Sequence, residues 1–299
     1  MPRIKANGIE LEYRETGSPD DPMLLLVSGF SAQMITFPQE LLDGLASAGR
    51  RVVIFDNRDI GFSTEFTNEV PPAPGDIING LREGKDMSCE VPYVLNDMAA
   101  DAAALITALG TDKADVMGFS MGGMIVQLMA LNHPDKVRTL IPVMTTSGDP
   151  SLPPSTPEAQ KALTAQPEMR TADAVADISV DSRRVIGSRD GIRSSDEEIR
   201  AMSKACFERS DRPMGVARQY AAILAQPRWH ERLSQVKAPT LVLHGAIDPL
   251  IRPAAGEDIA KRIPGAEIEL FDGWGHDMPK AMAGPLVARI KSFLDQHKP

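Results

Sequence analysis

Cysteine is scarce in this sequence of 299 residues, and no apolar run is long. The two cysteines, Cys89 and Cys206, match no metal-ligand spacing. We expect both to be free thiols in a reducing compartment, with one long-range disulfide as the less favoured alternative. No stretch approaches the length of a membrane span, and the first residues lack the apolar core of a signal peptide. These absences predict a cytoplasmic protein with no membrane segment.

The sequence also lacks a long basic run. Its 41 acidic residues outnumber its 32 basic ones, which gives a net charge of −9. This balance argues against nucleic acid or an anionic membrane surface as a partner, and it is typical of a soluble protein. Hydrophobic residues make up 42% of the chain and charged residues 24%, as is usual for a globular protein.

Short apolar runs recur along the chain and predict strands that are covered on both faces. They occupy residues 23–29, 51–57, 114–120, 137–145, 239–245 and 266–273. Helical patterns occupy residues 38–49, 95–110, 121–134 and 282–297. The alternation of strand and helix predicts an α/β fold with a mostly parallel, doubly wound sheet. Asn7 and Gly8, a strong turn pair, predict an antiparallel hairpin of the first two strands.

The alternation breaks between Ser147 and Arg228. This segment opens with a proline-rich linker and continues with helical patterns, in one of which Ser195 and Glu198 have the spacing of a capping box. We therefore expect residues 147–228 to form a helical cap inserted between two parts of one core, residues 1–146 and 229–299. A second irregular segment, Thr64 to Pro92, is rich in proline and glycine and predicts a long loop.

One serine stands at the turn between a predicted strand and a predicted helix. Ser120 is the centre of a G-x-S-x-G sequence, flanked by Gly118 and Gly122. In this setting the motif places a serine nucleophile on a tight turn, with its hydroxyl above the sheet. Side chains at the two glycines would collide with the neighbouring strand and helix. The alternative is a Gly-Ser-Gly turn without chemistry.

A serine hydroxyl needs a base to remove its proton. Among five histidines, His276 is the expected base, because it follows the last predicted strand in a glycine-rich loop. Asp248 follows the preceding predicted strand and is the carboxylate expected to orient the imidazole. Asp149 is the serious alternative acid. Asp277 adjoins the histidine but points away from it if His276 points inward.

An oxyanion hole needs two N–H donors. Met121, directly after the serine, is expected to supply one backbone N–H, and Phe30, after an earlier strand, the other. Met34, Trp274 and Met278 lie close to these motifs and are expected to line an adaptable apolar substrate pocket. The alternative for each methionine is a place in the core.

Five segments of the sequence resemble the α/β-hydrolase superfamily, and the resemblance extends along almost the whole chain. Within that superfamily the chain most resembles serine esterases of the aclacinomycin methylesterase type. The resemblance implies that Asp56, Arg58 and Ser63 are scaffold residues of a turn beside the site. The segments that carry it are "LLLVSGF", "FDNRDIGFS", "GFSMGGMIVQLMA", "LVLHGAIDPLI" and "GWGHDMP".

The order of the candidate catalytic residues agrees with this resemblance. Ser120, Asp248 and His276 follow the nucleophile–acid–base order of α/β hydrolases. One position departs from the pattern, because Ser28 precedes Gly29 where many relatives carry His-Gly before the oxyanion residue. The departure concerns Phe30, the expected second oxyanion donor, because the pair of residues before it differs from that of many relatives.

Together these features predict a serine hydrolase that cleaves a carboxylic ester through an acyl-enzyme intermediate. Its partner is expected to be a neutral, partly hydrophobic small-molecule ester, with no metal, no cofactor, no nucleic acid and no membrane; a homo-oligomer is left open. The alternatives on the same fold are a cofactor-free perhydrolase, also called a haloperoxidase, and a carbon–carbon bond hydrolase. A ligand-binding protein without catalysis is less favoured, because the triad is complete.

The resemblance further implies that the inserted helical segment is a lid that sets the substrate. The sheet would then supply the triad and the oxyanion hole by itself. We therefore expect removal of Ser151 to Pro227 to raise KM for large esters far more than for acetate esters.

Overall fold

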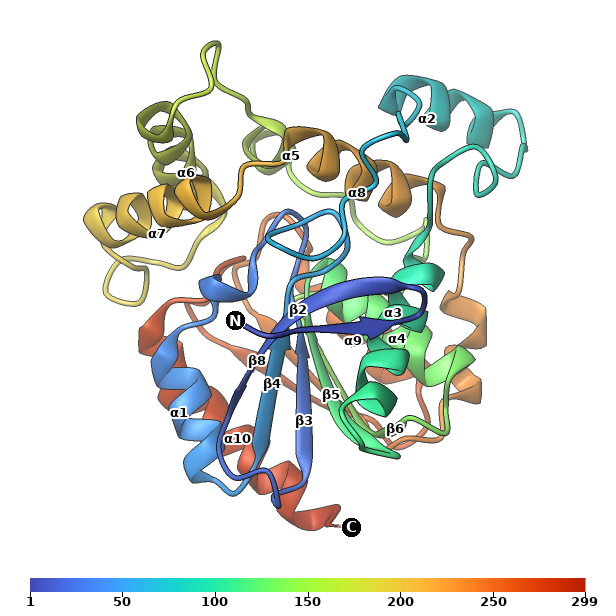
Figure 1. Ribbon diagram of the computed structural model, residues 1–299, viewed down its shortest axis with the longest axis vertical. Helices are drawn as coiled ribbons and strands as arrows, with labels where there is room; N and C mark the ends of the chain where they lie inside the picture. The colour runs from blue at the N-terminus through green and yellow to red at the C-terminus, as the bar shows by residue number, and fades with distance from the viewer. Residues whose placement is uncertain (299) are drawn as a thin grey trace.

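The computed structural model describes residues 1–298, which form one sheet with helices on both faces (Figure 1). The sheet has eight strands in the order β1-β2-β4-β3-β5-β6-β7-β8, in which β2 pairs antiparallel with both β1 and β4 and the other neighbours pair parallel. The predicted α/β fold with a mostly parallel sheet is confirmed. The strands are β1 (Arg3–Ala6), β2 (Ile9–Thr16), β3 (Met23–Val27), β4 (Arg51–Phe55), β5 (Ala114–Phe119), β6 (Val137–Val143), β7 (Leu241–Gly245) and β8 (Glu267–Phe271).

The central strands are apolar on both faces. In β3, Leu24 and Leu26 pack into one core cluster, whereas Leu25 and Val27 pack into another. Successive side chains of a strand point to opposite faces, so each face needs its own layer of helices. Helices α3 (Leu95–Ala108), α4 (Met121–Asn132) and α9 (Pro253–Arg262) cover one face, and α1 (Gln39–Ser47) and α10 (Ala283–Gln296) cover the other.

The predicted N-terminal hairpin is confirmed. Asn7 and Gly8 both have positive φ angles, 50° and 78°, as a two-residue turn between twisted strands requires. The Asn7 side chain also donates a hydrogen bond to Asp101 of α3, at 2.8 Å. The hairpin is thereby fixed against the helix layer.

The helical insertion, residues 147–228, lies between β6 and β7 and contains no strand among its described residues. At its third helix, Ser195 and Glu198 form the predicted capping box. In Figure 1 the four helices lie together at the top of the view, beyond one end of the sheet. Their role as a separate cap subdomain stays a prediction. They are α5 (Pro157–Thr164), α6 (Ala172–Ile186), α7 (Asp196–Arg209) and α8 (Pro213–Ala225).

The expectation of a continuous loop from Thr64 to Pro92 is wrong. This segment contains α2 (Pro74–Arg82), which begins at a proline because the first turn of a helix has N–H groups without helical partners. Ile77 is fully buried and packs in a small cluster with residues of α8. Gly80 leaves room for Met87, whose sulfur would lie 2.3 Å from an added Cβ. In this segment proline therefore begins a helix and glycine allows close packing against it, where a loop was expected.

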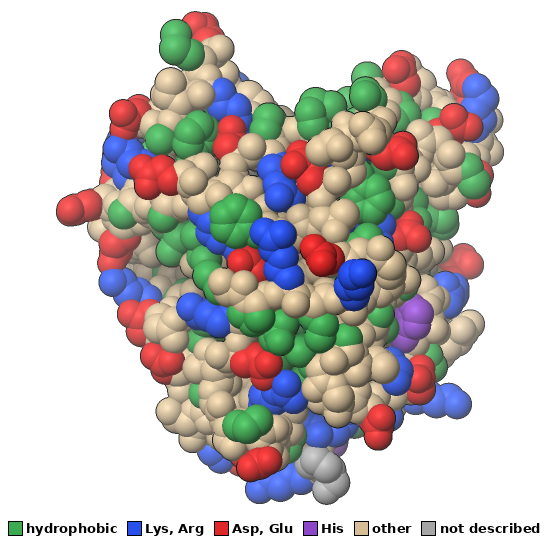
Figure 2. Space-filling model, in the orientation of Figure 1, with side chains coloured by type: hydrophobic (Ala, Val, Ile, Leu, Met, Phe, Trp, Pro, Cys, Tyr) green, Lys and Arg blue, Asp and Glu red, His purple; other side chains and the backbone are tan. Residues whose placement is uncertain are grey.

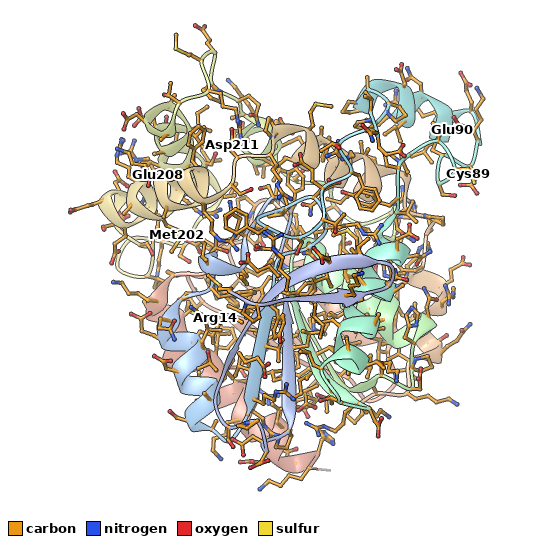
Figure 3. All side chains as sticks on the ribbon, viewed as in Figure 1. Arg14, Cys89, Glu90, Met202, Glu208 and Asp211 are labelled. Carbon is orange, nitrogen blue, oxygen red and sulfur yellow. The ribbon has the colours of Figure 1, made fainter. Side chains whose placement is uncertain are left out.

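The remaining general expectations concern thiols, charge and apolar length. Both cysteines are free, and Cys89 lies in the loop after α2, where Figure 3 labels it. On the face shown in Figure 2, acidic and basic side chains are interspersed and do not form one basic patch. Short 3₁₀ helices complete the described chain at Met34–Thr36, His230–Gln235 and Lys280–Met282. Among residues 1–298, no helix has both the length and the apolar character needed to cross a bilayer.

Candidate active site

Ser120 occupies the sharp turn between β5 and α4. Its φ of 54° and ψ of −117° are unusual for a residue with a side chain and mark local backbone strain. An added Cβ at Gly118 would lie 2.1 Å from the carbonyl oxygen of Gly122, in the helix. One at Gly122 would lie 2.1 Å from the carbonyl oxygen of Val27, in strand β3. The predicted need for glycine at both positions is confirmed.

Ser120, His276 and Asp248 lie within hydrogen-bond distance of one another in series. The Oγ of Ser120 is 3.0 Å from Nε2 of His276, and Nδ1 of His276 is 2.7 Å from Oδ2 of Asp248. The other oxygen, Oδ1, accepts hydrogen bonds from the backbone N–H groups of Leu250 and Ile251, at 2.8 and 2.9 Å. The carboxylate is buried and held in place, and the tautomer that suits it has the proton on Nδ1, which leaves Nε2 as an acceptor facing the serine hydroxyl.

The two rival carboxylates have other partners. Asp149 forms an ion pair with Arg262 and accepts a hydrogen bond from the backbone of Ser151, at 2.8 Å. Asp277 accepts two hydrogen bonds from Ser188, from the hydroxyl at 2.6 Å and from the backbone N–H at 3.1 Å. Neither carboxylate contacts the imidazole of His276. The geometry therefore favours Asp248 as the orienting acid.

A second histidine lies beside this acid. His244 is fully buried at the end of β7, and its Nε2 is 2.8 Å from the carbonyl oxygen of Ile251 and 3.7 Å from Oδ2 of Asp248. Burial lowers the pKa of His244, which keeps the ring neutral. A neutral ring donates one proton from Nε2, and this proton fixes the loop that presents Asp248. No local pattern marks this contact, because a four-residue spacing brings side chains together on a helix and here it joins a strand end to a loop.

Two backbone N–H groups beside Ser120 have no acceptor among the described residues. One belongs to Met121, at the first position of α4, and the other to Phe30. Gly29 brings the Phe30 loop close, since a Cβ added to that glycine would lie 3.3 Å from Cβ of Ser120. The start of a helix also carries partial positive charge, which favours an oxyanion there. The oxyanion role of the two amides stays a prediction.

The side chains expected to line the pocket lie in or against the core. Met34 and Trp274 have no exposed surface, and both belong to the cluster under α1 and α10. The indole N–H of Trp274 donates to the carbonyl oxygen of Asp277, at 2.8 Å. Met278 is half-buried against the same cluster. Met34 and Trp274 therefore reach no water-accessible space in this structure, and the pocket role of all three stays a prediction.

The turn after β4 is a scaffold, as the resemblance implied. Asp56 accepts a hydrogen bond from the backbone of Met34, at 2.8 Å, and pairs with Arg209 of the insertion, at 2.6 Å. Ser63 donates to the carbonyl oxygen of Asp56, at 2.5 Å. Arg58 pairs with a buried aspartate of α3, at 2.6 Å. These buried contacts hold the turn in place, which agrees with a scaffold role.

The insertion also contacts the loop of Phe30 and Ser31, which the sequence did not predict. The Gln219 side chain of α8 accepts a hydrogen bond from the backbone of Ser31, at 3.1 Å. The rings of Phe30 and Tyr220 lie 5.7 Å apart. No local pattern marks contacts between residues so far apart in the chain. Within the described part of the chain, no cluster of histidine, cysteine and carboxylate side chains is arranged to hold a metal ion.

Comparison with known proteins assigns the family. The sequence pattern of the alpha/beta hydrolase fold family matches residues 22–279. The chain belongs to the α/β-hydrolase family. This α/β hydrolase is 26% identical to the rhodomycin D methylesterase DauP of Streptomyces sp. (strain C5), over 96% of this chain and 95% of that protein. The predicted resemblance to the superfamily is confirmed, with a methylesterase among the relatives.

Other relatives of this α/β hydrolase carry a different activity in their names. A 2-hydroxy-6-oxononadienedioate/2-hydroxy-6-oxononatrienedioate hydrolase of Burkholderia vietnamiensis is 25% identical, over 91% of this chain and 87% of that protein. Among solved structures, a meta-cleavage product hydrolase from Pseudomonas fluorescens IP01 superposes with a TM-score of 0.77. The two sequences are 14% identical, and the match covers 100% of this chain and 98% of that chain. At this identity the similarity supports the fold alone.

Proposed function

We propose that this α/β hydrolase is a serine esterase that cleaves a carboxylic ester through an acyl-enzyme intermediate. The observation that carries the proposal is the series of contacts from Ser120 through His276 to Asp248, with both donor–acceptor distances at or below 3.0 Å. The methylesterase relative, which aligns along nearly the whole chain, supports an ester as the substrate.

In the proposed reaction His276 takes the proton of Ser120 as the serine oxygen attacks the ester carbonyl carbon. The carbonyl oxygen becomes an oxyanion, which the N–H groups of Met121 and Phe30 stabilise. The imidazolium then gives its proton to the departing alcohol, which leaves an acyl group on the serine. Water, deprotonated by His276, releases the acid and restores the enzyme. Asp248 stabilises the imidazolium at each stage.

For the substrate we infer a neutral, partly hydrophobic small molecule. The support is the apolar surface at the loop of Phe30, where the rings of Phe30 and Tyr220 pack together. A charged group would lose hydration beside such a surface. No metal and no organic cofactor enters the proposed chemistry, because the three side chains and two amides supply every proton transfer and charge contact it needs.

A carbon–carbon bond hydrolase is the second candidate, favoured by the relative from Burkholderia vietnamiensis. The two candidates share the serine and the base but differ in the bond that breaks. Assay of the 2-hydroxy-6-oxononadienedioate in that relative's name, beside simple p-nitrophenyl esters, separates them. Turnover of the dienedioate at a rate well above that of every ester would favour the second candidate.

The esterase proposal is tested by Ser120→Ala on a series of p-nitrophenyl esters of increasing acyl length. We expect the variant to lose at least about 10³-fold in kcat, because the remaining site binds the ester but has no nucleophile. Its melting temperature should stay close to that of the wild type, since one small polar atom is removed. A Ser120→Ala variant that retains most of its turnover would contradict the proposal.

A further inference from the structure

The loop that carries His276 is held by the helical insertion. The carbonyl oxygen of Ile186, the last residue of α6, accepts a hydrogen bond from the backbone N–H of His276, at 2.6 Å. Two residues on, the hydroxyl of Ser188 donates to Oδ1 of Asp277, at 2.6 Å, and its backbone N–H donates to Oδ2, at 3.1 Å. The same hydroxyl accepts from the backbone N–H of Gly275, at 3.2 Å. The residue on each side of the histidine thus bonds to one serine.

The two backbones are also in direct contact. A Cβ added to Gly275 would lie 2.3 Å from the carbonyl carbon and oxygen of Gly187, so the two backbone segments have no room to move toward each other. Ser188 and Asp277 are 5% and 7% exposed. Leaving a buried carboxylate without hydrogen-bond donors costs free energy, so we expect these contacts to persist.

The core holds the start of this loop, since the Trp274 ring is fully buried in it and the backbone N–H of Ile247 donates to the carbonyl oxygen of Trp274, at 3.2 Å. Within the loop, the indole N–H of Trp274 donates to the carbonyl oxygen of Asp277. The amide of His276 itself is bound by the insertion. The imidazole must stay within hydrogen-bond distance of both Ser120 and Asp248, and a displacement of about 1 Å in such a site can cost about a hundredfold in rate.

We propose that Ser188 and Asp277 are positioning residues for His276. Residues 186–188, at the end of α6, then form a brace, by which we mean a fixed support for the loop that carries His276. The inference rests on the proposed serine hydrolase function. Ser188 acts through Asp277, whose carboxylate lies one residue from the imidazole and points into the insertion. Neither residue contacts the substrate or the reacting atoms.

The brace reverses one expectation drawn from the sequence. There the sheet alone was expected to supply the triad, so that loss of the insertion would spare small esters. Because residues 186–188 hold the loop of His276, loss of the insertion should instead reduce turnover of small and large esters alike. The insertion would then position the catalytic base in addition to its expected role as a lid.

The test compares Ser188→Ala with Ser179→Ala, using p-nitrophenyl acetate as the smallest convenient ester. Ser179 is a matched control, because its hydroxyl bonds within the insertion, to Ser203 and to the Val175 carbonyl oxygen, both at 2.9 Å. We expect Ser188→Ala to lower kcat by about tenfold to a hundredfold with KM within about twofold of the wild type. Ser179→Ala should keep wild-type values for both constants.

Two further readouts separate positioning from general stability. Asp277→Asn leaves an amide group facing the donors of Ser188, so kcat should fall, and the Ser188→Ala/Asp277→Asn double variant should be no slower than the slower single variant. The rate at which a fluorophosphonate labels Ser120 should fall by the same factor as kcat, because labelling uses the same base and no ester pocket. Folding is checked by the melting temperature of each variant.

The outcomes divide cleanly. A folded Ser188→Ala variant with wild-type kcat and labelling rate would overturn the brace while leaving the esterase proposal intact, and so would a loss confined to KM. A wild-type protein that neither hydrolyses the ester nor takes up the probe would overturn the proposed function, and the brace with it.

Discussion

Replacement of Asp248 by asparagine should disable the triad by reversing the tautomer of His276. In the wild type, Oδ1 accepts two backbone N–H groups and Oδ2 accepts the Nδ1 proton. An asparagine must keep its oxygen toward the two N–H donors, because its amide nitrogen is itself a donor. The NH₂ group then faces Nδ1, which must accept, so the ring proton moves to Nε2. A protonated Nε2 cannot take a proton from Ser120.

The expected loss follows from that geometry. Loss of the orienting carboxylate in a triad lowers kcat by about 10⁴, equivalent to about 5 kcal/mol of transition-state stabilisation. The fold should be unaffected, because both backbone N–H groups keep an acceptor. The assay is steady-state hydrolysis of p-nitrophenyl acetate, with the melting temperature as the check on folding.

Two rival carboxylates supply the controls for this experiment. Asp149→Asn should keep nearly full activity, since Asp149 pairs with Arg262 away from the histidine. Asp277→Asn should fall between the two, because it weakens the support of the loop and leaves the tautomer unchanged. A crippled Asp149→Asn together with a mild Asp248→Asn would refute the reasoning.

Two other predictions concern packing and thiol chemistry. Gly122→Ala should destabilise the fold by about 3 kcal/mol in a denaturant titration, because its Cβ would lie 2.1 Å from the carbonyl oxygen of Val27. Gly75→Ala is the control, and with open space around it this change should alter stability by less than about 1 kcal/mol. Equal effects of the two substitutions would contradict the steric account. Burial raises the pKa of the Cys206 thiol to about 11, so near neutral pH a thiol reagent should modify exposed Cys89 quickly and half-buried Cys206 slowly, with the rate at Cys206 rising as the pH approaches that value. Two fast-reacting thiols in the native protein near neutral pH would contradict this account.

Features fixed by local geometry could be predicted from the sequence. The strand–turn–helix at Ser120 follows from glycine at 118 and 122, whose neighbours leave no room for a side chain. The approach of Asp248 to His276 follows from topology, since both come directly after adjacent parallel strands. In each case a short pattern and the rules of parallel sheets suffice.

Contacts between distant segments could not be predicted in the same way. Ser188 and Asp277 are 89 positions apart, and nothing in either neighbourhood marks the pair. Trp274, between two glycines of a loop, was expected to line the substrate pocket. It is buried because its ring packs edge-on against Phe271, at 5.5 Å, and its N–H finds a carbonyl oxygen. Whether such a side chain is buried depends on tertiary packing, which the hydrophobic periodicity of the sequence does not reveal.

The central claim is that Ser120 is a nucleophile activated by His276. The most direct test is to treat the native protein with a fluorophosphonate, digest it and locate the adduct by mass spectrometry. The account predicts a single adduct on Ser120, formed in step with complete loss of ester hydrolysis, and no comparable adduct in His276→Ala. An adduct on a different serine, or hydrolysis that persists after Ser120 is fully modified, would contradict it.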